Sequence, residues 1–274
     1  MLIIDSVSIG YADKQVVKNV SFTVSQGEFC ALLGLNGSGK TTLLKGICGL
    51  LPISDGRCFF DKIDLTKLGE KNRAKYVSLI PQRHSKLIGV TVMDAVLMGL
   101  NAKLGFLEFP SHQDKDSARN ALEKMGVSHL ANEDFSKLSE GQKQLVILAR
   151  TLVQDAPIML MDEPDSALDF PNKYMILSEA RGRGCEAGGR GCCFTFVNTE
   201  VKQHPRPPAS LVTLHDPNLA LKFCDKLILL SDGGVAAQLT LSGASLKDVQ
   251  TALSTVYKDI TVYEHSGGFK CDYA

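Results

Sequence analysis

The sequence has no charge excess of either sign and no long apolar run. Among 274 residues, 30 Lys and Arg side chains match 30 Asp and Glu side chains, so the formal net charge is zero. Proteins that bind nucleic acid through bulk positive charge need clustered Lys and Arg, so no nucleic-acid partner is predicted. No run approaches the ~18 apolar residues of a transmembrane helix, and residues 1–10 lack the basic start of a signal peptide. These absences predict a cytoplasmic chain.

Tryptophan is also absent, which excludes no class of protein. The length allows one large domain or two, and either can bury a core without disulfides or a structural metal. The eight cysteines are therefore expected mainly as buried thiols.

Short apolar strands alternate with helical segments along most of the chain. Residues 2–9 and 16–24 alternate apolar and polar side chains, which is typical of antiparallel strands. Further strands are predicted at 29–33, 76–80, 157–161, 211–214 and 227–230, with a helix at 41–51 and mostly helical structure at 91–153. This order favours an α/β fold with a mainly parallel sheet, an N-terminal antiparallel subdomain and an inserted helical subdomain at about 83–155.

A phosphate-binding loop is predicted at residues 34–41, which read GLNGSGKT between a predicted strand and a predicted helix. Glycines let the backbone wrap around phosphates, and the start of the helix attracts the anion. Lys40 is expected to reach the β- and γ-phosphates, and the Thr41 hydroxyl to ligate Mg²⁺. The alternative is a glycine-rich turn with a bystander lysine, which the flanking strand and helix disfavour.

Two acids end the apolar strand at residues 158–163, which read IMLMDE. Asp162 is placed to hold Mg²⁺ through water, and Glu163 to polarise an attacking water as a general base. Alone, these residues fit equally well as solvated acids at a strand end. Together with the phosphate loop they predict a nucleoside triphosphatase.

A third segment, LSEGQKQ at residues 138–144, completes a set of motifs. With GLNGSGKT and MDEP it resembles the ATP-binding cassette (ABC) ATPases, the motor subunits of ABC transporters, over essentially the whole chain. The resemblance implies a single ABC ATPase domain at 1–274 with a P-loop NTPase core, which binds ATP and Mg²⁺ and hydrolyses ATP. In this family the signature segment binds the γ-phosphate of ATP held by the other subunit. The resemblance therefore implies a head-to-tail dimer of this chain.

The resemblance also assigns roles to single residues. Tyr11 falls where the family places an aromatic that stacks on adenine, and Asp169 lies in the loop that crosses the dimer interface. Gln82 matches the glutamine that senses Mg²⁺ and water, and His215 matches the switch histidine that contacts the γ-phosphate. The expected ATP-binding residues are Tyr11, Gly34, Asn36, Gly37, Ser38, Gly39, Lys40, Thr41, Thr42, Ser139, Gly141, Gln142 and Asp169, with Glu163, His215 and Gln82 for catalysis and Thr41, Gln82 and Asp162 for the metal.

Several segments resemble one branch of the family, the subunits that power uptake of iron–siderophore, haem or cobalamin complexes. These segments are residues 91–100, 144–150, 215–220 and 242–263, the last resembling a short C-terminal helix and strand. The branch implies two transmembrane permease subunits, an extracytoplasmic substrate-binding protein that acts through them, and a peripheral position on the cytoplasmic face of the plasma membrane. The ligand itself is not specified, because this subunit does not touch it.

Other functions stay open. They are transport of another substrate class, a soluble cassette protein acting on DNA or ribosomes, and a non-hydrolysing ATP-binding regulator. The balanced charge and single cassette disfavour the soluble protein. A GTP-binding switch is disfavoured because residues 172–175 (NKYM) lack the acid of its base-reading motif.

The sequence departs from the family pattern at three places. Glu140 replaces the usual first glycine of the signature pair, and Asp165 replaces the usual threonine after the catalytic acid; both add negative charge. Residues 181–209 form an atypical insert rich in Gly, Arg, Cys and Pro. Its Cys and His residues match no standard zinc spacing, and its Arg residues are candidates for membrane contact. The simplest interpretation is a flexible loop, natural or produced by a gene-level error, and a strained one would misplace His215.

Overall fold

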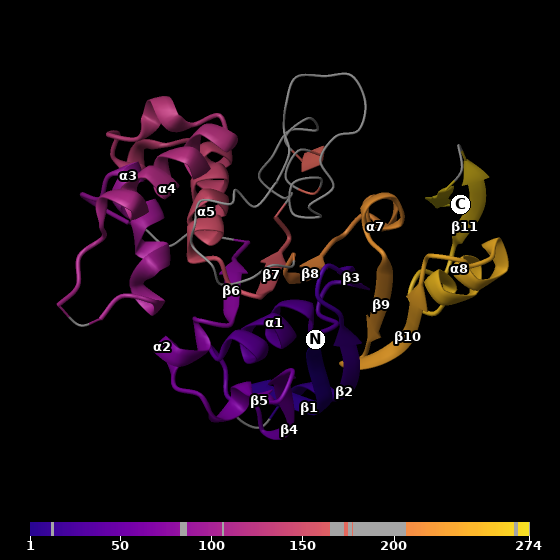
Figure 1. Cartoon of the computed structure of the whole chain (residues 1–274). Helices are drawn as coiled ribbons and strands as arrows, with labels where there is room; N and C mark the ends of the chain where they lie inside the picture. The colour runs from indigo at the N-terminus through magenta and orange to yellow at the C-terminus, as the bar shows by residue number, and fades with distance from the viewer. Residues whose placement is uncertain are drawn as a thin grey trace.

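A computed structural model of the chain describes residues 1–11, 14–82, 87–105, 107–164, 173–174, 177, 207–265 and 268–273. Two large sheets lie together, with a group of helices at one end and a helix with a two-stranded hairpin at the other (Figure 1). No helix in the described part of the chain is long and apolar enough to span a bilayer.

An antiparallel sheet forms the N-terminal subdomain, with the strand order β2-β1-β4-β5. Its strands are β1 (Leu2–Tyr11), β2 (Lys14–Val24), β4 (Asp55–Phe60) and β5 (Ile63–Asp64), followed by η1 (Leu65–Lys67) and α2 (Glu70–Arg73). Val20, Phe22 and Val24 of β2 are buried, whereas Ser21 between the first two is exposed. Alternate side chains of a strand point to opposite faces, so the sheet is covered on one face.

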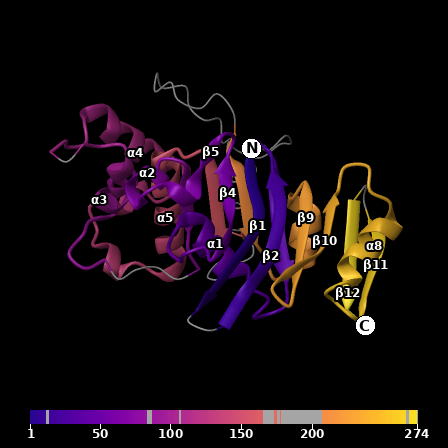
Figure 2. The same ribbon diagram turned by 90° about the horizontal axis from the view of Figure 1, so that it is seen from below.

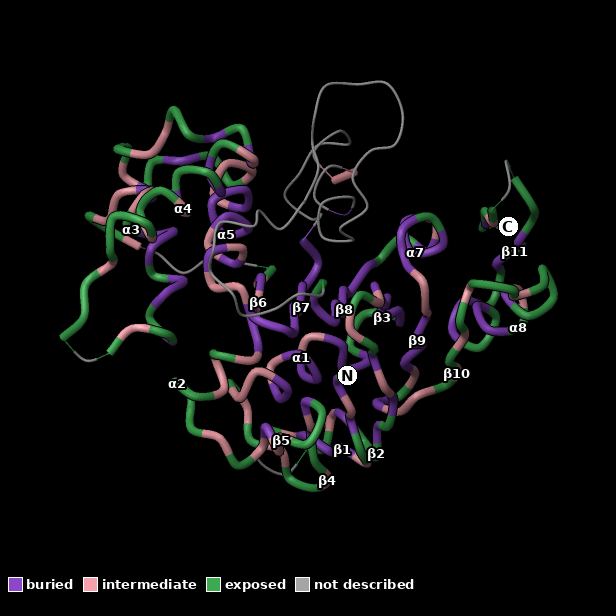
Figure 3. Tube along the Cα trace, viewed as in Figure 1, coloured by how far each residue is buried: buried purple, intermediate pink, exposed green. Residues whose placement is uncertain are grey.

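A six-stranded sheet in the order β10-β9-β3-β8-β7-β6 lies at the centre of the molecule. Its strands are β3 (Phe29–Gly34), β6 (Val77–Ile80), β7 (Ile158–Asp162), β8 (Ala209–Thr213), β9 (Lys226–Ser231) and β10 (Gly234–Thr240). Every pair is parallel except β9–β10. All residues of β3, β7 and β8 are buried, as parallel strands covered on both faces require (Figure 3).

The central sheet separates two hydrophobic cores. Phe29, Ala31 and Leu33 of β3 belong to the core that includes the helical subdomain. Cys30 and Leu32 belong to the core shared with the N-terminal sheet and α1 (Lys40–Cys48). Because alternate side chains of β3 pack into opposite cores, this strand separates the two cores. The alternation also fixes the point where the chain leaves the sheet.

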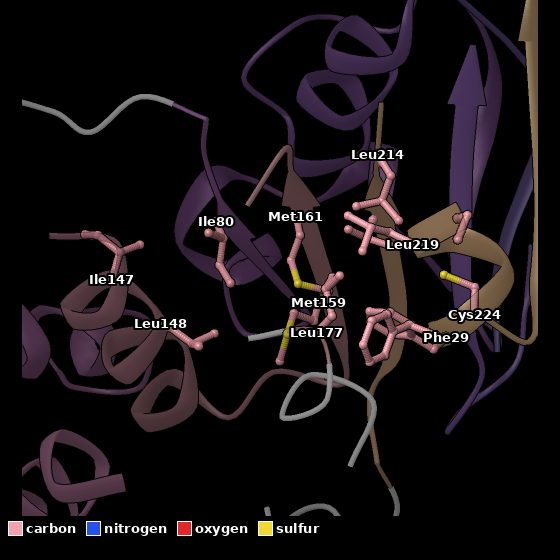
Figure 4. Packing of buried hydrophobic residues seen from close by; sticks show 14 of the residues in the cluster. Phe29, Ile80, Ile147, Leu148, Met159, Met161, Leu177, Leu214, Leu219 and Cys224 are labelled. Atoms are coloured by element: carbon pink, nitrogen blue, oxygen red, sulfur yellow. The ribbon is translucent and has the colours of Figure 1, made fainter. Parts of the chain in front are cut away.

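The helical subdomain lies beyond β6. It contains α3 (Val92–Leu97), η2 (Met98–Ala102), α4 (His112–Lys124), η3 (Ser128–Leu130), η4 (Phe135–Lys137) and α5 (Glu140–Gln154). A Cβ at Gly99 would lie 2.4 Å from the backbone oxygen of Arg150, so only glycine lets η2 approach α5 this closely. Leu148 of α5 points toward Ile80 and Met159 and ties the subdomain to the sheet (Figure 4).

The C-terminal unit lies beyond β10, on the side of the molecule opposite the helical subdomain (Figure 2). It contains α8 (Leu246–Ser254) and a hairpin of β11 (Ile260–His265) and β12 (Gly268–Tyr273). Between β8 and β9 runs α7 (Pro217–Phe223), which contacts both β3 and β12.

The predicted α/β architecture is confirmed, and the predictions that were wrong concern single elements. The predicted helix at 41–51 ends earlier, at Cys48, because Gly49 adopts a left-handed φ of +82° and closes the helix. The C-terminal region holds two strands where one was expected. The predicted insert at 181–209 extends too far, because Ala209 is already the first residue of β8. The rest of that stretch, up to residue 206, lies outside the described residues.

We expect Leu122→Ala to lower the free energy of unfolding by about 2–5 kcal/mol, because Leu122 is fully buried in the helical subdomain and its truncation leaves a cavity. Leu107→Ala is the matched control, since Leu107 is 82% exposed. Urea denaturation of both variants measures the difference, and equal losses would contradict the burial.

Candidate functional site

The phosphate loop connects β3 to α1 and depends on its glycines. Gly37 and Gly39 have φ values of +82° and +102°, which side-chain-bearing residues rarely adopt. A Cβ at Gly34 would lie 2.5 Å from the Ser38 Oγ and 2.6 Å from the Leu230 oxygen. The loop therefore closes tightly at the edge of the sheet and turns its backbone toward the start of α1.

A cavity of about 150 Å³ opens above this loop. It is lined by Val16, Asn36, Gly37, Ser38, Gly39, Lys40, Thr41, Thr42 and Glu163. The buried Ser38 hydroxyl has no hydrogen-bond partner within the described residues. An unpaired buried hydroxyl beside a helix N-terminus fits an anion that supplies the missing partner.

Lys40 is buried at the base of the loop, with 6% of its surface exposed. Its Nζ donates to the carbonyl oxygens of Gly34 at 2.7 Å and Leu35 at 3.3 Å. Burial lowers the pKa of the ammonium, and the negative charges of Glu163 and Asp162 partly offset that effect. A poorly hydrated cation held by carbonyl oxygens can transfer its hydrogen bonds to an entering phosphate.

Asp162 ends β7 directly beneath the loop. Its Oδ1 accepts hydrogen bonds from the Thr41 hydroxyl at 3.0 Å and from the Thr213 hydroxyl at 2.9 Å. A threonine hydroxyl beside a carboxylate is a hard oxygen donor set of the kind that Mg²⁺ prefers, so the residues present fit that ion.

Glu163 lies at the centre of a group of polar side chains. Its Oε1 is 2.6 Å from Nε2 of His215, and its Oε2 accepts a hydrogen bond from Nε2 of Gln82. Its backbone N–H donates to the Thr213 hydroxyl at 2.8 Å. The backbone of Glu163 has a φ of +46°, an uncommon left-handed conformation for a residue with a side chain. This turn directs the carboxylate to the wall of the cavity.

Gln82 and His215 therefore both contact Glu163, although the three predicted catalytic residues come from distant segments. His215 lies against Glu163, so the displacement that a strained insert would cause is not seen. The predicted metal residues Thr41 and Asp162 are also in contact. Asp169 and Asp165 lie outside the described residues.

The signature segment forms the start of α5. The Ser139 Oγ accepts from the Gln142 N–H at 3.3 Å, and the Gln142 Oε1 accepts from the Ser139 N–H at 3.0 Å, which makes a capping box. The carboxylate of Glu140 pairs with Lys143 at 2.8 Å. The charge that replaces the usual glycine is thus balanced one turn along the same helix.

The signature residues do not line the phosphate-loop cavity of their own chain. The lining contains neither Ser139, Gly141 nor Gln142. Tyr11 is also absent from it; this residue ends β1 opposite Lys14 and is 46% exposed. The structure thus brings together the phosphate loop and the acids, and it leaves the signature serine and Tyr11 outside this group.

Sequence reasoning missed two residues of the site. Thr213 bridges Asp162 and Glu163, and the signal for it was a single polar residue at the end of an apolar strand. Gln144 is buried on α5, and its Nε2 donates to the Pro164 oxygen at 3.2 Å. It connects the signature helix to the segment after Glu163, and only the three-dimensional contact identifies it.

Comparison with known proteins gives consistent matches. The family model described as ABC transporter matches residues 17–166. An uncharacterised ABC transporter ATP-binding protein of Haemophilus influenzae is 37% identical over 226 residues, which cover 82% of this chain and 78% of the relative. A hemin import ATP-binding protein of Shewanella denitrificans is 32% identical over 243 residues, covering 87% of each chain.

The fold also matches solved structures. A bacterial ABC transporter cassette solved as a dimer superposes with a TM-score of 0.70 and 26% sequence identity. The match covers 88% of this chain and 99% of that cassette.

We expect Thr213→Val to lower the free energy of unfolding by about 2–4 kcal/mol, because it leaves the Glu163 N–H and the Asp162 carboxylate without their shared partner. Thr213→Ser keeps the hydroxyl and should lose less than about 1 kcal/mol. Equilibrium denaturation compares the two, and a serine variant as unstable as the valine variant would refute the bridging role.

Proposed function

The chain belongs to the ABC transporter family, whose ATP-binding cassettes hydrolyse ATP to drive transport, and on that basis we propose that residues 1–274 form the ATPase subunit of an importer for an iron–siderophore, haem or cobalamin complex. The observation that carries the ATPase assignment is that Thr41 and Glu163 line the phosphate-loop cavity while Asp162 accepts a hydrogen bond from Thr41. A cation site and a general base then lie beside the place where a γ-phosphate would sit.

ATP binding is assigned to the loop and Lys40. The loop N–H groups and the start of α1 hold the phosphates, and the Lys40 ammonium moves its hydrogen bonds from Gly34 and Leu35 to phosphate oxygens. Thr41 and Asp162 are the residues that would hold Mg²⁺, which neutralises phosphate charge when bound. Tyr11 is assigned to adenine by its place in the sequence and its exposure near the end of β1.

Hydrolysis is assigned to Glu163 as general base. Its carboxylate accepts a proton from the attacking water, while Gln82 and His215 hold the two carboxylate oxygens in place. Thr213 anchors the backbone that carries this carboxylate. His215 is half exposed, which leaves it accessible to a γ-phosphate.

A second copy of the chain completes the site. ABC cassettes form dimers, and the signature residues of this chain lie outside its own cavity. We assign Ser139, Gly141 and Gln142 to the ATP bound by the other copy, with Asp169 at the interface between them. The Ser139 oxygen accepts from Gln142, so its proton remains available to donate to a phosphate.

The imported ligand is assigned as an iron–siderophore, haem or cobalamin complex. The relative named for hemin import and the sequence segments at 91–100 and 215–220 support this class. The proposal places the chain on the cytoplasmic face of the plasma membrane, bound to two permease subunits that receive ligand from an extracytoplasmic binding protein.

Glu163→Gln should lower the ATPase kcat at least about 100-fold, because an amide cannot accept the proton. ATP binding should persist, so size-exclusion chromatography with ATP and Mg²⁺ should show a trapped dimer. Lys40→Ala is the control, since it should lose ATP binding and stay monomeric. Hydrolysis by Glu163→Gln at the wild-type rate would refute the base assignment.

Affinity capture from membranes of the source organism, with the full chain as bait and mass spectrometry as the readout, tests the importer assignment. We expect a many-helix permease together with a binding protein for an iron complex or cobalamin. Capture of a permease whose binding protein takes another ligand would change the substrate class. Capture without any permease would contradict the importer itself.

A further inference from the structure

The C-terminal hairpin is joined to the segment that carries the switch histidine. Asn218 lies on α7, three residues after His215, and its side chain bonds to the backbone of β12 twice. Its Nδ2 donates to the Cys271 oxygen and its Oδ1 accepts from the Cys271 N–H, both at 2.9 Å. An amide that pairs with both the N–H and the C=O of one residue in this way fixes the position and the rotation of the start of α7.

The hairpin is itself held firmly by α8. Gln250 makes the same kind of paired contact there, with its Nε2 donating to the Ile260 oxygen at 2.8 Å and its Oε1 accepting from the Val262 N–H at 2.7 Å. Val262 and Cys271 are buried in the core that also contains β3. The Asn218 contact therefore ties α7 to a packed element rather than to a loose terminus.

The same unit also reaches the phosphate loop. The Tyr257 ring packs edge-on against Tyr273 of β12, with centroids 6.0 Å apart. Its buried hydroxyl lies beside the backbone N–H of Gly34 and makes no well-formed hydrogen bond within the described residues. Burial raises the pKa of this phenol, so the hydroxyl stays neutral. The C-terminal unit thus contacts the first residue of the loop as well as α7.

We propose that Asn218 is a positioning residue for hydrolysis, which uses the C-terminal hairpin as a fixed support to hold His215 against Glu163. The proposal rests on the role of His215 in the proposed function. The segment between β8 and α7 is short, so a shift of α7 moves His215 directly. The His215–Glu163 contact of 2.6 Å leaves little room for displacement.

Asn218→Ala should lower kcat about tenfold and leave the KM for ATP within about twofold, because displacement of a positioned group acts on the transition state rather than on ground-state binding. The purified full chain is assayed at saturating ATP, and kcat is expressed per bound nucleotide from a titration. This normalisation removes any loss of folded protein.

Gln250→Ala is the matched control, because it removes an equivalent pair of hydrogen bonds from the same hairpin on the side away from His215. We expect a comparable fall in melting temperature with kcat unchanged, because the buried side chains of Val262 and Cys271 still hold the hairpin against the core. Equal losses of kcat in both variants would overturn the proposal and leave Asn218 with a purely structural role. Asn218→Asp keeps the acceptor, loses the donor and adds a negative charge beside the Cys271 oxygen, so it serves as a second variant if alanine prevents folding.

A double-mutant cycle separates this proposal from the proposed function. If Asn218 acts through His215, Asn218→Ala should not slow the residual hydrolysis of His215→Ala any further. If Asn218→Ala lowers kcat by the same factor in the wild-type chain and in His215→Ala, the positioning role is overturned and the proposed function stands. A normal kcat for Asn218→Ala, together with slow hydrolysis by His215→Ala, has the same meaning. A wild-type kcat for His215→Ala would overturn the catalytic role of His215 and the positioning role with it.

Discussion

The burial of charged side chains at the carboxyl edge of the central sheet is the constraint on which the site depends. One ammonium, Lys40, and two carboxylates, Asp162 and Glu163, are each less than a tenth exposed. Buried charges are costly unless they are hydrogen-bonded. Lys40 donates to carbonyl oxygens of its own loop, whereas Asp162 and Glu163 have partners from distant segments. The two carboxylates therefore depend on the sheet, which aligns the ends of β3, β7 and β8.

The residues of the site that could be predicted are those that lie in short sequence motifs. The glycines of the phosphate loop, Lys40 and the acids after β7 are read from short patterns whose chemistry is fixed by residue type and spacing. Thr213, Gln144 and Asn218 were not predictable, since each acts through a partner 20 to 53 residues away in sequence. The same reason explains the fold: buried strands were recognised, whereas β4, β5, β10 and β12 depend on pairing with other strands.

The departures from the family pattern differ in their consequences. Glu140 adds a charge beside the segment that is assigned to a partner's phosphate, but its ion pair with Lys143 returns the local balance to zero. That pair is exposed on the glutamate side and contributes little to stability. The ion pair instead affects the electrostatic potential at the start of α5. There an unpaired Glu140 carboxylate would repel an anion, and a carboxylate paired with Lys143 repels it far less.

The alternate packing of β3 side chains into two cores limits where residues can be inserted or deleted. One core contains Phe29, Ala31 and Leu33, and the other contains Cys30 and Leu32. One inserted residue would exchange the two sets and carry the phosphate loop away from Asp162, whereas residues added to a surface loop leave this alternation unchanged. Insertions and deletions accepted during evolution should therefore be absent from residues 29–34 and concentrate between β7 and β8, where this sequence already carries its atypical stretch.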